Sequence, residues 1–189
     1  MEKFFILLSI IVISLALPYI FKIYSLKKIS EQDLPDSGSW IELSRGNIYF
    51  EWFLPKGNEE IKGTIVLVHG FSTPSFVWRG LLDNFTNSGY KVLVYDHFGR
   101  GHSERPSVKY DKYLYLETLR ELILSQEIQD KIHLVGYSMG GPIVGYYAEQ
   151  YPEETQSASL IAPAGFSKSI PDLRSWTTMP ILGDWYWRV

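Results

Sequence analysis

The chain has 189 residues, of which 46% are hydrophobic and 15% aromatic, and its formal net charge is −3. This length and composition predict one domain with a hydrophobic core and exclude a disordered chain. The small negative charge argues against nucleic acid as a partner, because nucleic-acid binding needs a clustered basic face. The sequence has no cysteine, which excludes disulfides, thiolate catalysis and cysteine-based metal sites.

The amino terminus carries an uncharged apolar run from Phe4 to Phe21, which is 18 residues long. A helix of this length is just able to span a bilayer. We therefore predict a single-pass membrane anchor over residues 1–28. The alternative is a cleaved signal peptide, because Ser14-Leu15-Ala16 resembles a small-x-small cleavage site.

The lysines around this run bear on its orientation. Three lysines follow it and one precedes it, which favours a cytoplasmic carboxyl-terminal side by a narrow margin. Residues 29–39 then become polar and contain Pro35-Asp36-Ser37-Gly38, a composition that predicts a linker.

The next elements alternate between strand and helix. Residues 40–43 and 48–53 predict a hairpin of aromatic and β-branched residues. Continuous apolar runs predict buried strands over residues 64–68 and 91–95, because strands of a parallel sheet are covered on both faces. Helical spacing of apolar residues predicts helices over residues 76–88 and 110–127.

The stretch Gly136-Tyr137-Ser138-Met139-Gly140-Gly141 has the Gly-x-Ser-x-Gly pattern of a nucleophile elbow. An apolar strand over residues 131–137 precedes it and a helix from Pro142 to Gln150 is predicted after it. In an elbow the chain passes from a strand through a tight, strained turn into a helix, so that the serine hydroxyl is exposed. Ser138 is therefore the candidate nucleophile. The small residues beside it allow the two flanking backbones to approach closely.

Two glycines after the strand at residues 91–95 could suggest a nucleotide loop. Gly99 and Gly101 lack the third glycine of a dinucleotide fingerprint, because position 104 is glutamate, and no P-loop pattern occurs. We interpret them as a tight turn at a strand end. Neither a metal nor an organic cofactor is expected.

Three signatures in this order resemble the α/β-hydrolase superfamily: Leu67-Val68-His69-Gly70-Phe71, Asp96-His97-Phe98-Gly99-Arg100-Gly101-His102-Ser103, and the elbow. The resemblance extends from about Trp40 to the end of the chain. It is greatest for the small-molecule esterase, monoacylglycerol-lipase-like and carbon–carbon hydrolase branches. A serine at the nucleophile position argues against haloalkane dehalogenases and epoxide hydrolases, which carry aspartate there.

The resemblance implies an α/β-hydrolase fold, a mostly parallel sheet with helices on both faces. The core would occupy residues 40–166, with a last strand over residues 158–162. Residues 167–189 are rich in tryptophan and proline and look like the start of a cap, although their aromatic side chains could equally pack on the core. The resemblance also implies an oxyanion hole formed by the backbone N–H groups of Phe71 and Met139.

The predicted function is hydrolysis of a carboxylic ester or related acyl bond through an acyl-enzyme on Ser138. The substrate would be a small-molecule or lipid-like ester. Two alternatives stay open: a non-catalytic binding protein that keeps the pocket, and an acyltransferase that uses the same serine. The sequence leaves chain length, natural substrate and oligomeric state undetermined.

The histidines raise a difficulty for this function. In the α/β-hydrolase order the acid and the histidine follow the serine, but all four histidines precede Ser138. His69 is expected to brace its loop and His133 to pack within its strand. Asp172 and Asp184 follow Ser138 but fall in the cap start. We therefore predict a chain truncated before its acid and histidine, with an exposed apolar edge strand and no ordinary esterase activity.

Overall fold

The computed structural model describes residues 2–25, 29–57 and 60–165. The amino-terminal helix and the folded unit Ile29–Phe166 are separate bodies, so each is described by itself. The cap expected over residues 167–189, including Asp172 and Asp184, lies outside the described residues.

The apolar run at the amino terminus forms one helix, α1 (Glu2–Ser25), which continues through Pro18. Its stretch Lys3–Lys22 has a mean hydropathy of 2.6, and none of its residues is fully buried. A helix that is apolar around its whole circumference is suited to a lipid environment. A membrane anchor and a signal sequence both have this length and composition.

The folded unit begins with the 3-10 turn η1 (Glu31–Asp33) and a hairpin of β1 (Gly38–Leu43) and β2 (Gly46–Phe53). The two strands are antiparallel, with Leu43 opposite Gly46 at the turn. Gly46 has a φ of +133°, a conformation that a residue with a side chain rarely adopts. The hairpin predicted from the sequence is confirmed.

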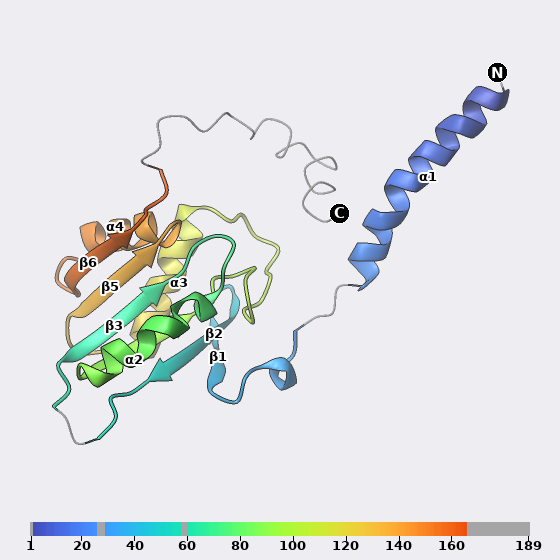
Figure 1. Cartoon of the computed structure of the whole chain (residues 1–189). Coiled ribbons are helices and arrows are strands. Elements are labelled where there is room, and N and C mark those ends of the chain that lie inside the picture. Colours follow the sequence, from blue (N-terminus) through green and yellow to red (C-terminus); the bar gives the residue numbers. More distant parts are fainter. Residues whose placement is uncertain (1, 26–28, 58–59, 166–189) are drawn as a thin grey trace. The chain divides into compact units, whose positions relative to one another are not determined.

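Parallel strands continue the sheet: β3 (Gly63–Val68), β4 (Tyr90–Tyr95), β5 (Ile132–Tyr137) and β6 (Thr155–Ile161). The order across the sheet is β1-β2-β4-β3-β5-β6, with β2 antiparallel to β4 (Figure 1). The position of β3 between β4 and β5 explains its uninterrupted apolar sequence, because a central strand is covered on both faces. This mostly parallel α/β sheet is the predicted fold class.

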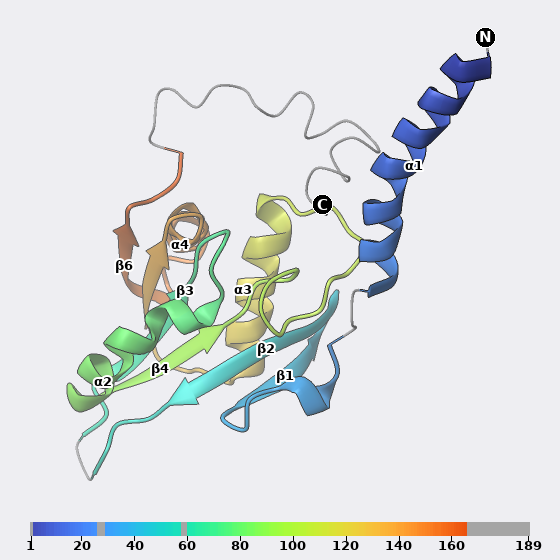
Figure 2. The same ribbon diagram turned by 45° about the vertical axis from the view of Figure 1, so that its right-hand side comes forward.

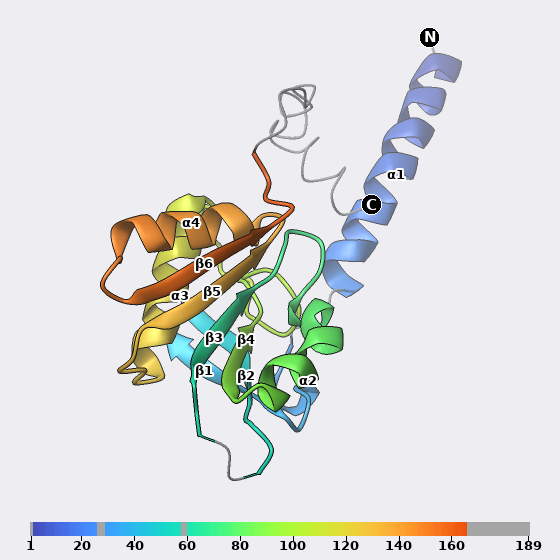
Figure 3. The same cartoon turned by 60° about the vertical axis from the view of Figure 1, so that its left-hand side comes forward.

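Helices cover both faces of the sheet. The 3-10 turn η2 (Ser75–Trp78) and α2 (Arg79–Asn87) pack on one face. Helices α3 (Lys112–Ser125) and α4 (Gly140–Gln150) pack on the other, as Figures 2 and 3 show from two sides.

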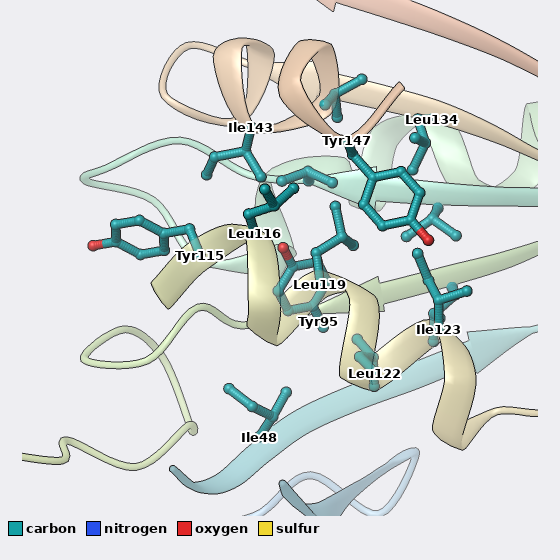
Figure 4. Packing of buried hydrophobic residues seen from close by; sticks show 14 of the residues in the cluster. Ile48, Tyr95, Tyr115, Leu116, Leu119, Leu122, Ile123, Leu134, Ile143 and Tyr147 are labelled. Carbon is teal, nitrogen blue, oxygen red and sulfur yellow. The ribbon is translucent and has the colours of Figure 1, made fainter. Parts of the chain in front are cut away.

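The side chains of β3 and β4 alternate between two hydrophobic clusters, one on each face. The smaller cluster lies under α2, and its buried members are Ile65, Leu67, Trp78, Leu82, Val92 and Val94. The larger cluster lies under α3 and α4 (Figure 4), and its fully buried members include Val66, Leu93, Tyr95, Leu119, Leu122 and Tyr147. This period of two is what a strand buried on both faces produces.

Three helices begin at residues other than those predicted. Helix α2 starts at Arg79 instead of residue 76, because the preceding residues form the 3-10 turn η2. Helix α3 starts at Lys112 instead of residue 110, because the Asp111 carboxylate accepts hydrogen bonds from the backbone N–H groups of Tyr113 and Leu114. Helix α4 starts at Gly140 instead of Pro142. Proline fits the first turn of a helix, where its missing N–H would have no intrahelical partner.

The last described strand also differs from its prediction. β6 spans Thr155–Ile161, three residues earlier at its start than residues 158–162. Among the described residues it pairs with β5 alone. Its Leu160 and Ile161 are 40% and 42% exposed, so the described part of the chain has the apolar edge that the sequence predicts.

Candidate active site

Ser138 lies in a strained turn between β5 and α4. Its φ is +52°, in the left-handed region that residues with a side chain seldom occupy. Three backbone hydrogen bonds hold this conformation. The Ser138 N–H donates to the Ile161 carbonyl (3.0 Å), and the Ser138 carbonyl accepts from the N–H groups of Gly141 (3.1 Å) and Ala164 (2.9 Å). The turn therefore depends on the strand that follows it as well as on its own sequence.

Glycines allow this turn to close. A Cβ atom at Gly136 would lie 2.3 Å from the Gly140 carbonyl oxygen, and one at Gly140 would lie 2.1 Å from the Val68 carbonyl oxygen. These neighbours are backbone atoms, which cannot rotate away. Gly141 faces Pro163, with 2.6 Å from its ideal Cβ to the proline Cβ, so it serves the packing against the segment after β6.

The loop after β3 lies directly against the elbow. An ideal Cβ on Gly70 would be 3.1 Å from the Ser138 Cβ and 3.4 Å from the Tyr137 carbonyl oxygen. The fold thus brings the loop that contains Phe71 beside the turn that contains Ser138 and Met139. Met139 is also the N-cap residue of α4. The three candidate site residues come from the carboxyl ends of two neighbouring parallel strands, the usual position for sites in α/β sheets.

Arg100 contacts both the carbonyl oxygen and the ring of Phe71. Its Nε donates a hydrogen bond to the Phe71 carbonyl oxygen (2.5 Å), and its guanidinium carbon lies 4.3 Å from the centre of the Phe71 ring. A second hydrogen bond runs from the Arg100 guanidinium to the Gly99 carbonyl (2.9 Å). The sequence analysis assigned no role to Arg100, since residues 71 and 100 are far apart in the chain and only the fold brings them together.

His69 braces the loop, as predicted. Because the backbone N–H of His97 donates to its Nε2 (2.9 Å), its proton lies on Nδ1, which donates to the Gly70 carbonyl oxygen (2.7 Å). The side chain is fully buried. Burial is the main cause that lowers the pKa of His69 below 6.5. With both ring nitrogens engaged, His69 has no free nitrogen to accept a proton from Ser138.

His97 is also a structural histidine. It is fully buried, and its Nε2 lies 3.1 Å from the His69 carbonyl oxygen, to which it donates. Burial, followed by the repulsion of neighbouring His69, lowers the pKa of His97 well below 6.5. The two imidazoles are therefore neutral and link the loop after β3 to the loop after β4.

Asp96 organises the loop after β4. Its carboxylate accepts hydrogen bonds from the backbone N–H groups of Ser75 (2.7 Å) and His102 (2.9 Å). The His102 ring lies 3.7 Å from the same carboxylate. A Cβ at Gly101 would lie 1.8 Å from an Asp96 oxygen, which explains the glycine in this turn. The interpretation of Gly99 and Gly101 as a tight turn agrees with this arrangement.

His133 lies at the other end of β5. Its Nδ1 is 2.8 Å from the Ser157 hydroxyl, and its ring packs edge-on against Tyr90. Four strand residues lie between it and Ser138, and the five residue steps span about 16 Å. Among the described residues, no hydrogen bond joins any histidine to Ser138. The described residues also contain no group of three or more His, Asp or Glu side chains placed to hold a metal ion.

A mostly parallel sheet with a strained strand-to-helix turn at the carboxyl end of a central strand is the architecture of the α/β-hydrolase class. The family described as alpha/beta hydrolase fold matches residues 63–184. The chain belongs to this family.

Named relatives include lipases. The chain is 36% identical over 114 residues to lipase 1 of Psychrobacter immobilis, covering 57% of this chain and 34% of that protein. It is 31% identical over 124 residues to monoacylglycerol lipase abhd6-B of Xenopus laevis, covering 65% of this chain and 36% of that protein. The chain thus spans about a third of the length of these relatives.

A solved structure shares the fold. The esterase from Exiguobacterium antarcticum superposes with a TM-score of 0.60 at 23% identity, covering 71% of this chain and 48% of that one. This similarity supports the arrangement of strands and helices around the elbow.

Proposed function

We propose that this protein is a serine hydrolase that cleaves a carboxylic ester through an acyl-enzyme on Ser138. The observation that carries the proposal is the geometry of Ser138, with a φ of +52° between a central strand and the start of α4. Strain of this kind costs about 1–3 kcal/mol and is retained mainly where function requires it.

In the proposed reaction the Ser138 Oγ attacks the ester carbonyl carbon while a base takes its proton. The carbonyl oxygen of the substrate becomes an oxyanion, which the backbone N–H groups of Phe71 and Met139 stabilise. Each such donor contributes roughly 3 kcal/mol in the transition state. The alkoxide leaves with a proton from the same base, and water then releases the acid. The base and its acid partner are expected after Ser138 in the chain.

The substrate class is proposed from the relatives. Proteins named as lipase and monoacylglycerol lipase act on lipid esters, so a lipid-like ester is the proposed substrate. The apolar stretch Lys3–Lys22 fits this proposal, because a single-pass anchor would hold the enzyme at the surface where such substrates are found. The lysine balance favours a folded unit on the cytoplasmic side by a narrow margin. The proposed domains are an anchor over residues 1–28, a hydrolase core to residue 166 and the start of a cap over 167–189. The predicted linker, residues 29–39, is part of the folded unit, which begins at Ile29.

The experiment is ester hydrolysis by a form of the protein that carries the acid and histidine expected after Ser138. Release of p-nitrophenol from a short-chain ester should disappear in Ser138→Ala and persist in the control Ser39→Ala, which changes an exposed serine of β1. Adding an alcohol acceptor should not increase the rate of p-nitrophenol release. Transfer to the alcohol in preference to water would identify an acyltransferase, and binding without turnover in the unsubstituted protein would identify a binding protein.

A further inference from the structure

A basic cavity lies at the amino ends of the parallel strands, at the opposite end of β5 from Ser138. Its volume is about 400 Å³, within the usual range of small-molecule sites. The cavity is lined by Ile61, Lys62, Gly63, Thr64, Lys91, Asp130, Lys131, His133 and Gln156. The lining therefore comes mainly from residues at the starts of β3, β4 and β5.

Positive charge dominates this lining. Lys62, Lys91 and Lys131 contribute three ammonium groups, while Asp130 is the one carboxylate of the lining. Within the part of the chain that the structure describes, none of these three lysines forms an ion pair. Like charges gathered without partners repel one another, so a bound anion would relieve a cost that the protein otherwise carries.

The segments that line this cavity meet at the amino ends of the strands. Lys91 of β4 is paired with Thr64 of β3, and His133 of β5 is paired with Ile65, the next residue of β3. Because side chains alternate along a strand, Lys91 and His133 leave the sheet on opposite faces. Lys131 immediately precedes β5. The lining therefore joins basic groups from both sides of this edge of the sheet.

Gly63 lines the cavity and has no side chain to fill it. An ideal Cβ at this position would be in contact distance of His133 Nε2, at 3.8 Å, and of the Tyr90 ring, also at 3.8 Å. The other ring nitrogen of His133 is bonded to the Ser157 hydroxyl at 2.8 Å. Nε2 is therefore the nitrogen of His133 that is available to a group beside Gly63. In the tautomer in which Nδ1 accepts from Ser157, Nε2 carries the hydrogen and would donate to an anion.

We infer that this cavity binds a phosphate group, either free in solution or as part of a phosphate ester. Three ammonium groups and one imidazole in the same lining match the charge and the several acceptor oxygens of a phosphate. The site is independent of the proposed hydrolysis at Ser138, because it shares no residue with the elbow and lies at the other end of the sheet.

Titration calorimetry on the full chain in detergent tests the site with inorganic phosphate at constant ionic strength. We expect saturable binding that weakens at least about tenfold in Lys91→Gln/Lys131→Gln. The matched control is Lys56→Gln/Lys109→Gln, which removes the same charge from exposed lysines outside the cavity and should bind phosphate as the unsubstituted chain does. Equal weakening in both double variants, or no saturable binding, would overturn the inference.

A second variant and a second pair of probes sharpen the result. His133→Gln should weaken phosphate binding about tenfold with an unchanged thermal midpoint; unchanged binding would remove His133 from the site and overturn the inferred geometry. Glycerol 3-phosphate and dihexanoyl phosphatidic acid distinguish the two sources of the group. Equal affinity supports a soluble phosphate ester, and preference for the phosphatidic acid supports a lipid headgroup.

Discussion

The two ends of the parallel strands are built in opposite ways. At the carboxyl ends, backbone segments meet so closely that a Cβ at Gly140 would be 2.1 Å from the Val68 carbonyl oxygen. At the amino ends, a Cβ at Gly63 would meet no atom closer than 3.8 Å, and lysines surround an open cavity. The first end is closed by backbone contacts, whereas the second is open and basic. One sheet thus positions the Ser138 turn at one end and leaves a cavity accessible to solvent at the other.

The histidines follow the same division. At the carboxyl ends His69 and His97 are fully buried and committed to backbone hydrogen bonds. At the amino ends His133 is half-buried, with one nitrogen toward the cavity. A buried histidine near a serine is a common candidate for a catalytic base. The hydrogen bonds of His69 and His97 instead connect the loop after β3 to the loop after β4.

The largest expected effect concerns turnover by the 189-residue chain alone. Because none of the four histidines is hydrogen-bonded to Ser138 in the described residues, we expect its ester hydrolysis to fall short of triad-level rates by about 10⁴-fold or more. The measurement is p-nitrophenyl ester hydrolysis by this chain. Robust turnover that disappears in Ser138→Ala would show that one of the four histidines acts as the base.

The second prediction tests the closed end of the sheet through stability. Gly140→Ala places a methyl group against the Val68 backbone, so we expect a loss of about 3 kcal/mol or more in the free energy of unfolding. Gly80→Ala is the control, because a Cβ there meets no atom within 4 Å in α2. Alanine should stabilise that helix by up to about 1 kcal/mol. Urea unfolding followed by tryptophan fluorescence gives both values, and equal stability of the two variants would contradict the packing described.

The third prediction concerns pH. The folded state keeps His69 and His97 neutral because burial lowers their pKa values below 6.5, whereas the unfolded chain protonates them near that value. The unfolded state therefore binds more protons below pH 6.5, and stability is lost as the pH falls, by up to about 1.4 kcal/mol per pH unit for each histidine. Urea unfolding at pH 7.5 and about pH 5.5 measures this loss. A slope that is the same in His97→Asn as in the unsubstituted chain would remove His97 from the explanation.

The smallest effect is expected at Arg100. In a form of the protein that hydrolyses esters, Arg100→Met removes the hydrogen bond to the Phe71 carbonyl. The Phe71 residue, whose N–H lies in the preceding peptide group, should then be held less firmly for the oxyanion. We expect kcat to fall about tenfold with little change in KM, because the oxyanion forms only in the transition state. Arg79→Met, at an exposed position of α2, should leave both constants unchanged. A rise in KM alone would indicate a role for Arg100 in substrate binding.

Much of this architecture was predictable from local pattern. Apolar runs located β3, β4 and β5 to within a residue or two, because strands covered on both faces need apolar side chains throughout. The elbow was predictable from its glycines, since few other residues fit where backbones nearly touch.

Other features depend on contacts between loops far apart in the chain. The bond from Arg100 to Phe71 and the proton position on His69 follow from the meeting of the loops after β3 and β4, which no local pattern records. The basic cavity is similar, because Lys62, Lys91 and Lys131 belong to three separate segments and become neighbours only through strand register.

The central claim is that Ser138 is the nucleophile, and mapping a covalent adduct tests it most directly. A form of the protein that hydrolyses esters would be treated with a fluorophosphonate, digested and analysed by mass spectrometry. We predict one phosphonylated residue, Ser138, and no labelling in Ser138→Ala. An adduct on another serine, or labelling that persists in the alanine variant, would contradict the account.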